Sequence, residues 1–357
     1  MPILLLLFAS LSFASPVIVS LEGKSFNTTM DQLDSLSQKM HAKTKRCGGF
    51  ISSWEGKTFF QPRTEKFNIN LNYTIERENL VHEYLHEVRE DRLLSVMEWF
   101  SSYPTRFYTT PAGERAMLDL AEKWKKIVRN LNYANVEILR HEKWSQPSII
   151  LTMRGQEQES IILGGHGDSI NTDLNEPHAV APGADDNASG ISVLTEIISV
   201  LAEKGYRPKH TLKFMAYAAE EVGLMGSMEI SERAVRNQEV IRGVLQFDGT
   251  NFPGSKEFKI VLVNDHTSEK QNQFLGMILD TYLKIPWGYD KCGYACSDHY
   301  SWTYRGYPAS FPFESIISEE NSHIHTANDT LQMMNNSASH SVSFAKLGLA
   351  YVIELDK

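Results

Sequence analysis

The sequence predicts an α/β fold in which helices cover both faces of a mostly parallel central sheet. Two observations support this prediction. Short apolar runs of strand length alternate along the chain with longer segments whose apolar residues recur at helical spacing. This alternation is typical of parallel sheets, because the connection between two parallel strands is long enough to form a helix. No internal repeat interrupts the pattern, so we expect one α/β domain over residues 76–357.

The expected helices begin at about residue 78, and the longest one opens at Pro111 and Gly113. Apolar residues at helical spacing predict helices near residues 80–88, 93–100, 117–131, 191–201, 225–240, 274–283 and 340–355. Short apolar runs predict strands at residues 149–153, 161–163, 212–217, 244–247, 258–263 and 309–313. We expect a polar turn at residues 154–160 to join the first two strands.

The N-terminal region differs from the rest of the chain. Residues 1–14 form a short apolar segment that ends in Ser-x-Ala, which is the pattern of a secretory signal peptide. This segment is too short to span a bilayer, and no later segment is long and apolar enough, so we expect a secreted protein without a membrane anchor. Residues 15–75 have weak periodicity and fit two descriptions equally, a pro-segment removed after secretion and a small domain packed on the core.

Charge and cysteine content narrow the possible partners. The net charge is −9 and the chain has no long Lys/Arg run, which argues against nucleic acid or an anionic membrane as the main partner. Cys292 and Cys296 are separated by three residues. In an exported protein this spacing favours a local disulfide over a zinc site, because no second cysteine pair is present. Cys47 is left without a partner in this interpretation.

Histidine and acidic residues follow the predicted strands at the points where those strands end. In open α/β sheets, ligands bind outside the carboxyl ends of the strands. The candidates at this edge, in chain order, are His166, Asp168, Asp186, Glu220, Glu221, Asp248 and His325. Helix or turn capping explains one or two such placements, but it does not explain the whole set.

The chemistry of this set fits a pair of zinc ions. Two histidines and three carboxylates, one of them shared, give each zinc one nitrogen and two carboxylate groups. The adjacent Glu220 and Glu221 cannot serve the same purpose, so one of them can bind metal while the other accepts a proton from a bridging water. Asp168 is placed two residues after His166 to orient its imidazole, although a simple turn cap is the alternative.

These residues lie in motifs that resemble those of the bacterial secreted leucyl aminopeptidases, a family of co-catalytic di-zinc exopeptidases. The similar motifs are Gly-His-Gly-Asp-Ser at 165–169, Pro-Gly-Ala-Asp-Asp-Asn-Ala-Ser-Gly at 182–190, Ala-Ala-Glu-Glu-Val-Gly-Leu at 218–224, Phe-Asp-Gly-Thr-Asn at 247–251 and Ile-His-Thr at 324–326. Residues 289–299 also resemble the disulfide-bearing substrate loop of that subgroup. The resemblance extends from about residue 80 to the C-terminus and implies the zinc-dependent exopeptidase fold.

The resemblance implies a role for each site residue. Asp186 would bridge two zinc ions, with a cis peptide bond following it. The remaining ligands would be His166 and Asp248 on one zinc, and Glu221 and His325 on the other. Glu220 would be the general base and Asp168 a further catalytic residue that orients His166. The substrates would be peptides with a free N-terminus, shortened by one residue per cut, and we expect a monomeric enzyme.

The resemblance also implies a pocket for the first side chain of the substrate, with a preference for large apolar, leucine-like residues. Its lining would be Gly249, Tyr294, Phe311, Phe313, Ile317, Ile324 and the Cys292–Cys296 disulfide. Two glycines depart from the family pattern. Gly249 stands where leucine-preferring relatives carry a large apolar residue, so we expect a wider pocket, which also contains the unexpected charge of Glu320. Gly167 also replaces a larger residue, so we expect looser packing behind His166.

Two other functions are compatible with the same scaffold. Glutaminyl cyclases share the fold but use a single zinc, and some receptor-like ectodomains keep the fold without the metal ligands. The full set of ligands together with Glu220 favours the two-metal hydrolase over both.

Overall fold

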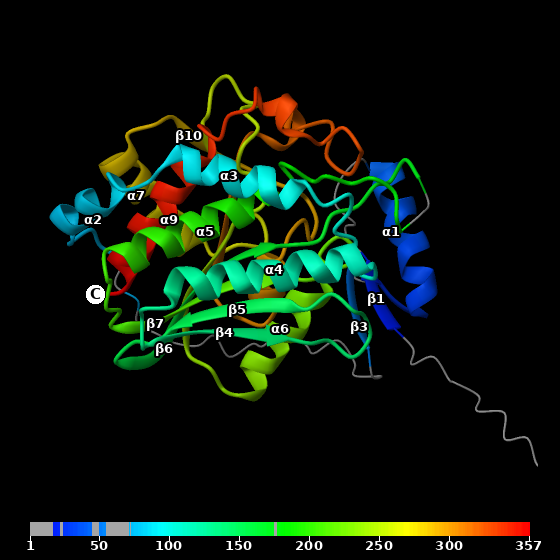
Figure 1. Ribbon diagram of the computed structural model, residues 1–357, viewed down its shortest axis with the longest axis horizontal. Helices are drawn as coiled ribbons and strands as arrows, with labels where there is room; N and C mark the ends of the chain where they lie inside the picture. Colours follow the sequence, from blue (N-terminus) through cyan, green and yellow to red (C-terminus); the bar gives the residue numbers. More distant parts are fainter. Residues whose placement is uncertain (1–16, 22–23, 45–49, 55–70, 72, 175–176) are drawn as a thin grey trace, which may run out of the picture.

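The computed structural model describes residues 17–21, 24–44, 50–54, 71, 73–174 and 177–357. In this part of the chain an eight-stranded sheet lies between helices, and a smaller three-stranded sheet with one helix lies beside it (Figure 1). The predicted signal peptide, residues 1–14, and Cys47 lie outside the described residues.

The large sheet is mixed but mostly parallel in its centre, which confirms the predicted fold class. Its strands, in spatial order, are β10 (Trp287–Asp290), β9 (Ile260–Val263), β11 (Ala309–Phe313), β8 (Ile241–Gln246), β6 (Glu157–His166), β7 (His210–Tyr217), β5 (Ser148–Met153) and β4 (Ala134–Leu139). Strand β6 pairs in parallel with both β7 and β8, and β8 pairs in parallel with β11. Antiparallel pairs join β9 to β11, β7 to β5 and β5 to β4.

Two strands of the large sheet and one α-helix of the main domain were not predicted from the sequence. The strands β4 and β10 are the two edges of the sheet, and their residues are mostly half-buried or exposed, so neither contains a continuous apolar run. Helix α8 (His299–Tyr304) has six residues, which is too short for a helical period to be recognised. The polar turn expected at 154–160 is shorter in the structure, because β6 begins at Glu157 with exposed polar residues.

The longer helices agree with the predicted ones to within a few residues at most of their ends. They are α2 (Glu78–Leu85), α3 (Glu90–Ser101), α4 (Pro111–Val128), α5 (Ala188–Glu203), α6 (Met225–Arg236), α7 (Glu269–Ile278) and α9 (Ser341–Leu355). Helix α4 begins where Pro111 occupies the first turn and the Thr110 side chain accepts a hydrogen bond from the N–H of Gly113. A π-helical segment, Leu279–Leu283, continues α7, and short 3₁₀ helices occupy Ile317–Glu319 and Leu331–Met334.

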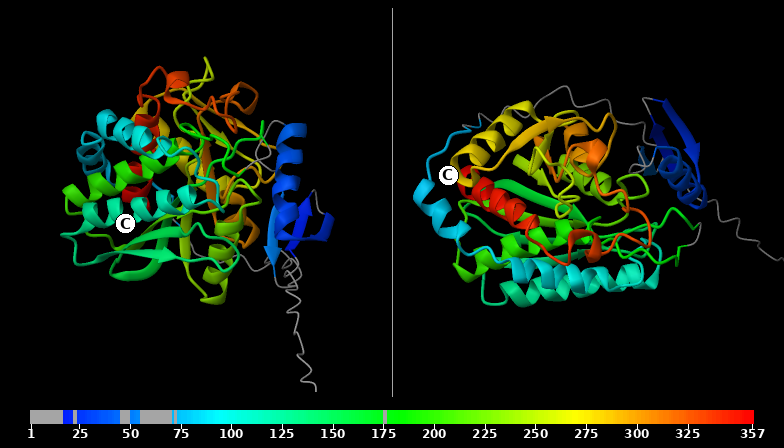
Figure 2. Two further views of the ribbon diagram at one scale, coloured as in Figure 1. Left: turned by 45° about the vertical axis from the view of Figure 1, so that its right-hand side comes forward. Right: turned by 90° about the horizontal axis from the view of Figure 1, so that it is seen from above.

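Alternate residues of the central strands bury the two faces of the sheet against different helices. Ile161 and Leu163 of β6 belong to a core cluster with α4, α5 and α9, whereas Ile162 between them packs in a cluster with Ile230 of α6 and Trp302 of α8. Two views show helices on either side of the sheet (Figure 2). Because both faces are covered, most polar groups on these strands lie near the strand ends.

The described N-terminal residues, 17–54 with their gaps, form a separate small unit that we call the N-terminal arm. It consists of an antiparallel sheet, in the order β2 (Lys24–Thr28), β1 (Val17–Leu21), β3 (Ile51–Trp54), and helix α1 (Met30–Thr44). Figures 1 and 2 show the arm at one end of the large sheet. Its apolar residues Val17, Leu33 and Phe50 share a buried cluster with Tyr108 and Val222 of the main domain.

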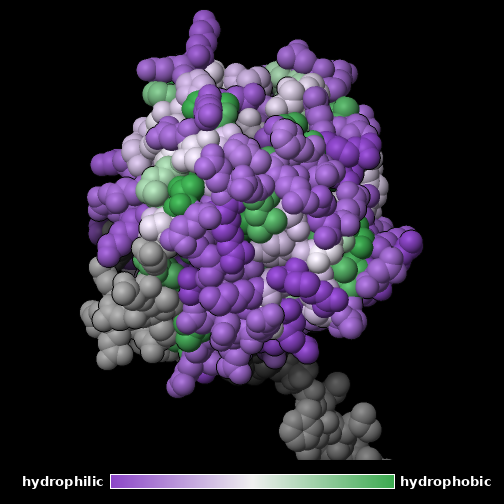
Figure 3. Space-filling model, turned by 90° about the vertical axis from the view of Figure 1, so that its left-hand side faces the viewer, coloured by the Kyte–Doolittle hydropathy of each residue, from purple (hydrophilic) through white to green (hydrophobic). Residues whose placement is uncertain are grey.

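The surface contains no extended apolar region on the face shown in Figure 3, where small green patches are separated by hydrophilic residues. Within the described ranges, no helix combines the length and the apolar character needed to cross a membrane.

Candidate active site

The predicted site residues meet at the carboxyl ends of the central strands. His166 is the last residue of β6, Glu220 and Glu221 follow the end of β7, and Asp248 follows the end of β8. Two more residues come from loops, Asp186 just before α5 and His325 between the two 3₁₀ helices. All of these side chains are buried. The topology therefore assembles residues that are up to about 160 positions apart in sequence, as ligand sites in α/β sheets generally do.

Asp186 lies between the two histidines and turns one carboxylate oxygen toward each. Its Oδ1 is 2.9 Å from Nε2 of His166, and its Oδ2 is 2.8 Å from Nε2 of His325. Each histidine has a second carboxylate partner. His166 Nε2 is 3.1 Å from Asp248 Oδ1, and His325 Nε2 is 3.2 Å from Glu221 Oε2. His166, Asp186 and Asp248 thus form one buried group of ligand atoms, and Asp186 also contacts His325, which lies next to Glu221.

The buried atoms of this cluster fit metal ions. No described residue gives a well-directed hydrogen bond to either oxygen of Asp186 or of Glu221, although all four atoms are buried. Buried carboxylates without donors are costly unless a cation balances them. Burial by itself would raise the pKa of Asp186, but the two imidazoles beside its oxygens hold this pKa well below its usual range. Asp186 is therefore an anion suited to bridge two cations.

Asp168 positions the loop that carries both glutamates. Its Oδ1 accepts a hydrogen bond from the N–H of Glu220 at 3.0 Å, and its Oδ2 accepts one from the N–H of Glu221 at 3.1 Å. Oδ1 of Asp168 is also 3.4 Å from Nδ1 of His166, which is longer than a good hydrogen bond. The predicted contact with His166 is therefore present but long, and no sequence pattern indicated the two shorter backbone hydrogen bonds.

Asp329 supports the backbone at Asp186 in the way that Asp168 supports the backbone at Glu220 and Glu221, and it was not predicted from the sequence. Its carboxylate accepts hydrogen bonds from the N–H groups of Asp185 and Asp186, at 3.0–3.2 Å. Asn187 follows a cis peptide bond after Asp186, which confirms the bond implied by the resemblance, and its amide donates to the carbonyl of Phe247 at 2.9 Å. The only sequence signal for Asp329 was its position four residues after His325.

Arg106 was also missed, because nothing in its local sequence distinguishes it from a surface arginine. Its guanidinium is fully buried and donates to the carbonyl oxygens of Gly167 and Gly183, both at 2.9 Å, and of Pro182. Burial lowers the pKa of Arg106 to about 10, and nearby carboxylates, led by Asp329, oppose that effect. The cation thus fixes the two loops that precede Asp186 and follow His166.

A pocket with about 430 Å³ of empty space opens beside Asp186 and Asp248. All the residues predicted for the first side-chain pocket line it, namely Gly249, Cys292, Tyr294, Cys296, Phe311, Phe313, Ile317 and Ile324. Glu320 lines it as well. Most of this lining is apolar or aromatic, as in many small-molecule sites.

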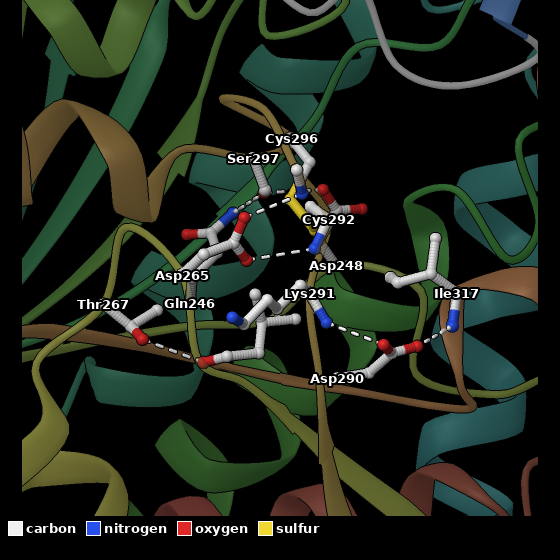
Figure 4. The surroundings of a disulfide bond; sticks show 12 residues. Gln246, Asp248, Asp265, Thr267, Asp290, Lys291, Cys292, Cys296, Ser297 and Ile317 are labelled. Atoms are coloured by element: carbon white, nitrogen blue, oxygen red, sulfur yellow. Dashed lines mark hydrogen bonds between the residues drawn. A yellow bond between two sulfur atoms is a disulfide. The ribbon is translucent and has the colours of Figure 1, made fainter.

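A disulfide joins Cys292 and Cys296 at the rim of the pocket, as predicted (Figure 4). Asp265 fixes this loop, since its carboxylate accepts hydrogen bonds from the N–H of Cys292 at 3.0 Å and of Gly293 at 2.7 Å. Next to the disulfide, Ser297 Oγ donates to Asp248 Oδ2 at 2.6 Å. The pocket wall and a candidate metal ligand are thereby connected.

The structure corrects both expectations about glycines. A side chain at Gly249 would meet the ring of Phe313 at 2.7 Å, so Phe313 fills the space that a larger residue would occupy and the pocket is not widened there. Behind His166, a Cβ at Gly167 would lie 2.2 Å from the sulfur of Met117. Met117 is fully buried, so this region is tightly packed rather than loose.

The site also contains a histidine that was not among the predicted residues. His41 comes from helix α1 of the N-terminal arm, and its Nε2 lies 3.5 Å from Glu221 Oε2. Together with Glu221 and His325 it forms a third buried group whose atoms could hold a metal ion.

A mostly parallel sheet that gathers two imidazoles and several carboxylates at its strand ends is an arrangement suited to a metal-dependent hydrolase. The comparison with known sequences makes this class more specific. The chain belongs to peptidase family M28, whose sequence profile matches residues 148–350. Membership of this family confirms the predicted enzyme class and implies bound metal ions, for which the buried groups described above are candidates.

Individual relatives agree with this assignment. The chain is 32% identical over 299 residues to a probable leucine aminopeptidase of Arthroderma benhamiae, covering 83% of this chain and 80% of the relative. It is 34% identical over 308 residues to the probable aminopeptidase YDR415C of Saccharomyces cerevisiae, covering 83% and 82%. The crystal structure of LapB from Legionella pneumophila superposes with a TM-score of 0.81 at 25% identity, covering 96% of this chain and 99% of LapB.

Proposed function

We propose that this protein is a di-zinc aminopeptidase that releases large apolar residues from the N-terminus of peptides. The observation that carries the proposal is the position of Asp186, with one oxygen 2.9 Å from His166 and the other 2.8 Å from His325. One zinc would be held by His166, Asp186 and Asp248, and the other by Asp186, Glu221 and His325. Zinc ions bound there would polarise a peptide carbonyl and make a water acidic enough to lose its proton near neutral pH.

Glu220 is proposed as the general base. It lies in one buried group with His166 and Glu221, whose ligand atoms are within 4.8 Å of one another, so it is close to both candidate metal positions. No described residue donates a hydrogen bond to its Oε2. Burial raises the pKa of Glu220 well above its usual range, although His166 opposes this effect. A carboxylate with a raised pKa can hold the proton that it takes from water and return it to the leaving amine.

The pocket beside Asp186 supports the proposed substrate class. The aromatic and aliphatic lining suits an apolar first side chain, and the ring of Phe313 occupies the space beside Gly249. The carboxylates Asp186 and Asp248 at the pocket also suit the cationic α-amino group of a peptide. A free N-terminus is then part of recognition, which restricts cleavage to one residue at a time.

The proposal is tested by metal content and turnover together. Metal-loaded protein should contain about two zinc per chain and release leucine from a chromogenic leucyl amide. Glu220→Gln should keep both zinc ions and lose about 10²–10⁴-fold in kcat, because proton transfer is removed while the ligands remain. Glu122→Gln, on the exposed face of α4, is the matched control and should behave like the wild type.

Each alternative function predicts a different result. A non-catalytic protein would not hydrolyse the amide even when loaded with metal, and a cyclase-like enzyme would hold one zinc and cyclise an N-terminal glutamine. Full activity of Glu220→Gln would remove Glu220 as the base while leaving the two-zinc site in place.

We also propose that the protein is secreted as a monomer. The apolar segment at residues 1–14 and the disulfide at Cys292 and Cys296 support export, because disulfides persist in oxidising compartments. The mass of the protein recovered from culture medium tests this proposal and shows whether residues 15–75 are retained. Sedimentation of the same sample tests the monomer, and a dimer mass would contradict it.

A further inference from the structure

His41 of the N-terminal arm lies inside the candidate active site. It is located on α1, three residues before the end of the helix, and its side chain is almost completely buried. Its Nε2 is 3.5 Å from Glu221 Oε2, and its ring contacts the ring of His325 edge to face, with 4.5 Å between the centroids. The arm therefore contributes an imidazole to a site that the main domain otherwise builds alone.

The second ring nitrogen of His41 determines how the imidazole is presented. Nδ1 lies 2.7 Å from the carbonyl oxygen of Ser37 and donates a hydrogen bond to it. A neutral imidazole that donates through Nδ1 carries its lone pair on Nε2. No described residue forms a hydrogen bond with Nε2, although the atom is buried. This is the arrangement of metal-ligating histidines, whose other nitrogen usually donates to a carbonyl or carboxylate.

The spacing of the ligand atoms fits a single tetrahedral zinc. Nitrogen and oxygen ligands at about 2.0–2.2 Å from zinc lie about 3.3–3.5 Å from one another in this geometry. His41 Nε2 and Glu221 Oε2 are 3.5 Å apart, and His325 Nε2 and Glu221 Oε2 are 3.2 Å apart. His41, Glu221 and His325 form one buried group whose ligand atoms lie within 4.8 Å of one another, and Asp186 Oδ2 lies beside this group, 2.8 Å from His325 Nε2.

We propose that His41 is the fourth protein ligand of the zinc held by Asp186, Glu221 and His325, and that it latches the N-terminal arm over a closed metal site. This inference rests on the proposed two-zinc function. Catalytic zinc sites keep one position open for water or substrate, whereas sites with four protein ligands are closed. Release of His41 would open a position on this zinc for water, so the turnover expected above comes from molecules in which His41 has left the metal.

Other contacts of the arm converge on the same loop. Ser37 Oγ donates to the carbonyl oxygen of Glu221 at 2.7 Å, and the N–H of Ser52 donates to the carbonyl oxygen of Gly223 at 3.1 Å. The Phe50 ring fills the space beside Gly223, where a Cβ would come within 2.6 Å of it. The arm thus holds the loop of Glu220 and Glu221 through its backbone while His41 reaches the metal position. Because binding equilibria are reciprocal, zinc should strengthen the docking of the arm and the docked arm should strengthen zinc binding.

Zinc titration of the full chain tests the proposal. Metal-free wild type, His41→Ala, His41→Cys and Lys39→Ala are titrated with Zn²⁺ in competition with a chromophoric chelator. Lys39 lies on the exposed side of α1 and is the matched control. We expect the affinity for one of two zinc ions to fall at least about tenfold in His41→Ala, to recover in His41→Cys because thiolate binds zinc, and to be unchanged in Lys39→Ala.

Limited proteolysis gives a second readout that does not depend on activity. Zinc should slow cleavage within the arm in the wild type and in Lys39→Ala, but not in His41→Ala. If His41→Ala does not fold, Co²⁺ is added to His41→Cys, where a cobalt–thiolate charge-transfer band is expected and its absence would overturn the proposal. Equal zinc affinities and equal protection of the arm in wild type and His41→Ala would overturn the proposal that His41 binds zinc and holds the arm, and would leave the two-zinc proposal standing. A wild-type chain that binds fewer than two zinc ions would overturn both proposals.

Discussion

Replacing Asp168 by asparagine should weaken the fold and the metal site together, because this carboxylate supports the loop of Glu220 and Glu221. Each carboxylate oxygen accepts one backbone N–H, at 3.0 and 3.1 Å, in a fully buried environment. An asparagine at the same position has one acceptor oxygen, and its other terminal atom is an amide nitrogen that carries only donors. One of the two N–H groups would therefore face a donor.

The magnitude follows from the bonds that are lost. A hydrogen bond to a charged group contributes about 1.5–3 kcal/mol, and a buried donor left without a partner costs about 1–3 kcal/mol. We expect the free energy of unfolding of the metal-free protein to fall by about 2–5 kcal/mol. Zinc affinity should fall by about 10–100-fold, as is typical when a residue that supports a metal ligand is changed.

Urea unfolding of metal-free protein and zinc titration provide the assay. The exposed Asp173 is the control, and Asp173→Asn should change the unfolding free energy by less than about 0.5 kcal/mol. If Asp168→Asn unfolds within 0.5 kcal/mol of the wild type, the backbone role assigned to Asp168 is wrong. Weaker zinc binding without any loss of stability would indicate instead that Asp168 acts through the longer contact with His166.

Three further predictions concern packing and pH. Gly167→Ala should destabilise the protein by about 1–3 kcal/mol, and by clearly less when Met117 is shortened to alanine; additive effects in the double variant would contradict the contact with Met117. Gly249 has φ +60°, so Gly249→Ala should lower the free energy of unfolding by about 1–3 kcal/mol. The new methyl group should also press Phe313 into the pocket and raise KM for leucyl amides more than for alanyl amides. An unchanged ratio of the two KM values would be evidence against this contact. Burial lowers the pKa of His299 to about 3, so the unfolded state takes up a proton below about pH 6.5 while the folded state does not, and acid destabilises the fold. His299→Phe should remove this loss of stability. Between pH 7 and pH 4 its unfolding free energy, measured with urea on metal-free protein, should rise by about 3 kcal/mol relative to that of the wild type. Parallel pH profiles of the two proteins would refute this prediction.

Local patterns in the sequence were sufficient for the central elements of the fold. Strands such as β5 and β8 are short apolar runs because both of their faces are covered, and α4 has clear helical spacing because only one side of it is buried. The edge strands β4 and β10 escaped prediction because they are not covered on both faces and need no continuous apolar run. The candidate ligands could be placed at one edge because strand ends in a parallel sheet share that edge.

By itself, the sequence determined the α/β class, the motifs of family M28 and the set of histidines and carboxylates, since each depends on residues close together in the chain. Tertiary structure alone decided what surrounds that set. Met117 fills the space at Gly167, and Asp168 supports the glutamate loop as well as standing near His166. It also brought His41 from the N-terminal arm to Glu221 and His325. These contacts join segments remote in sequence, and no local period or motif encodes which distant side chains meet when the arm and the sheet pack together.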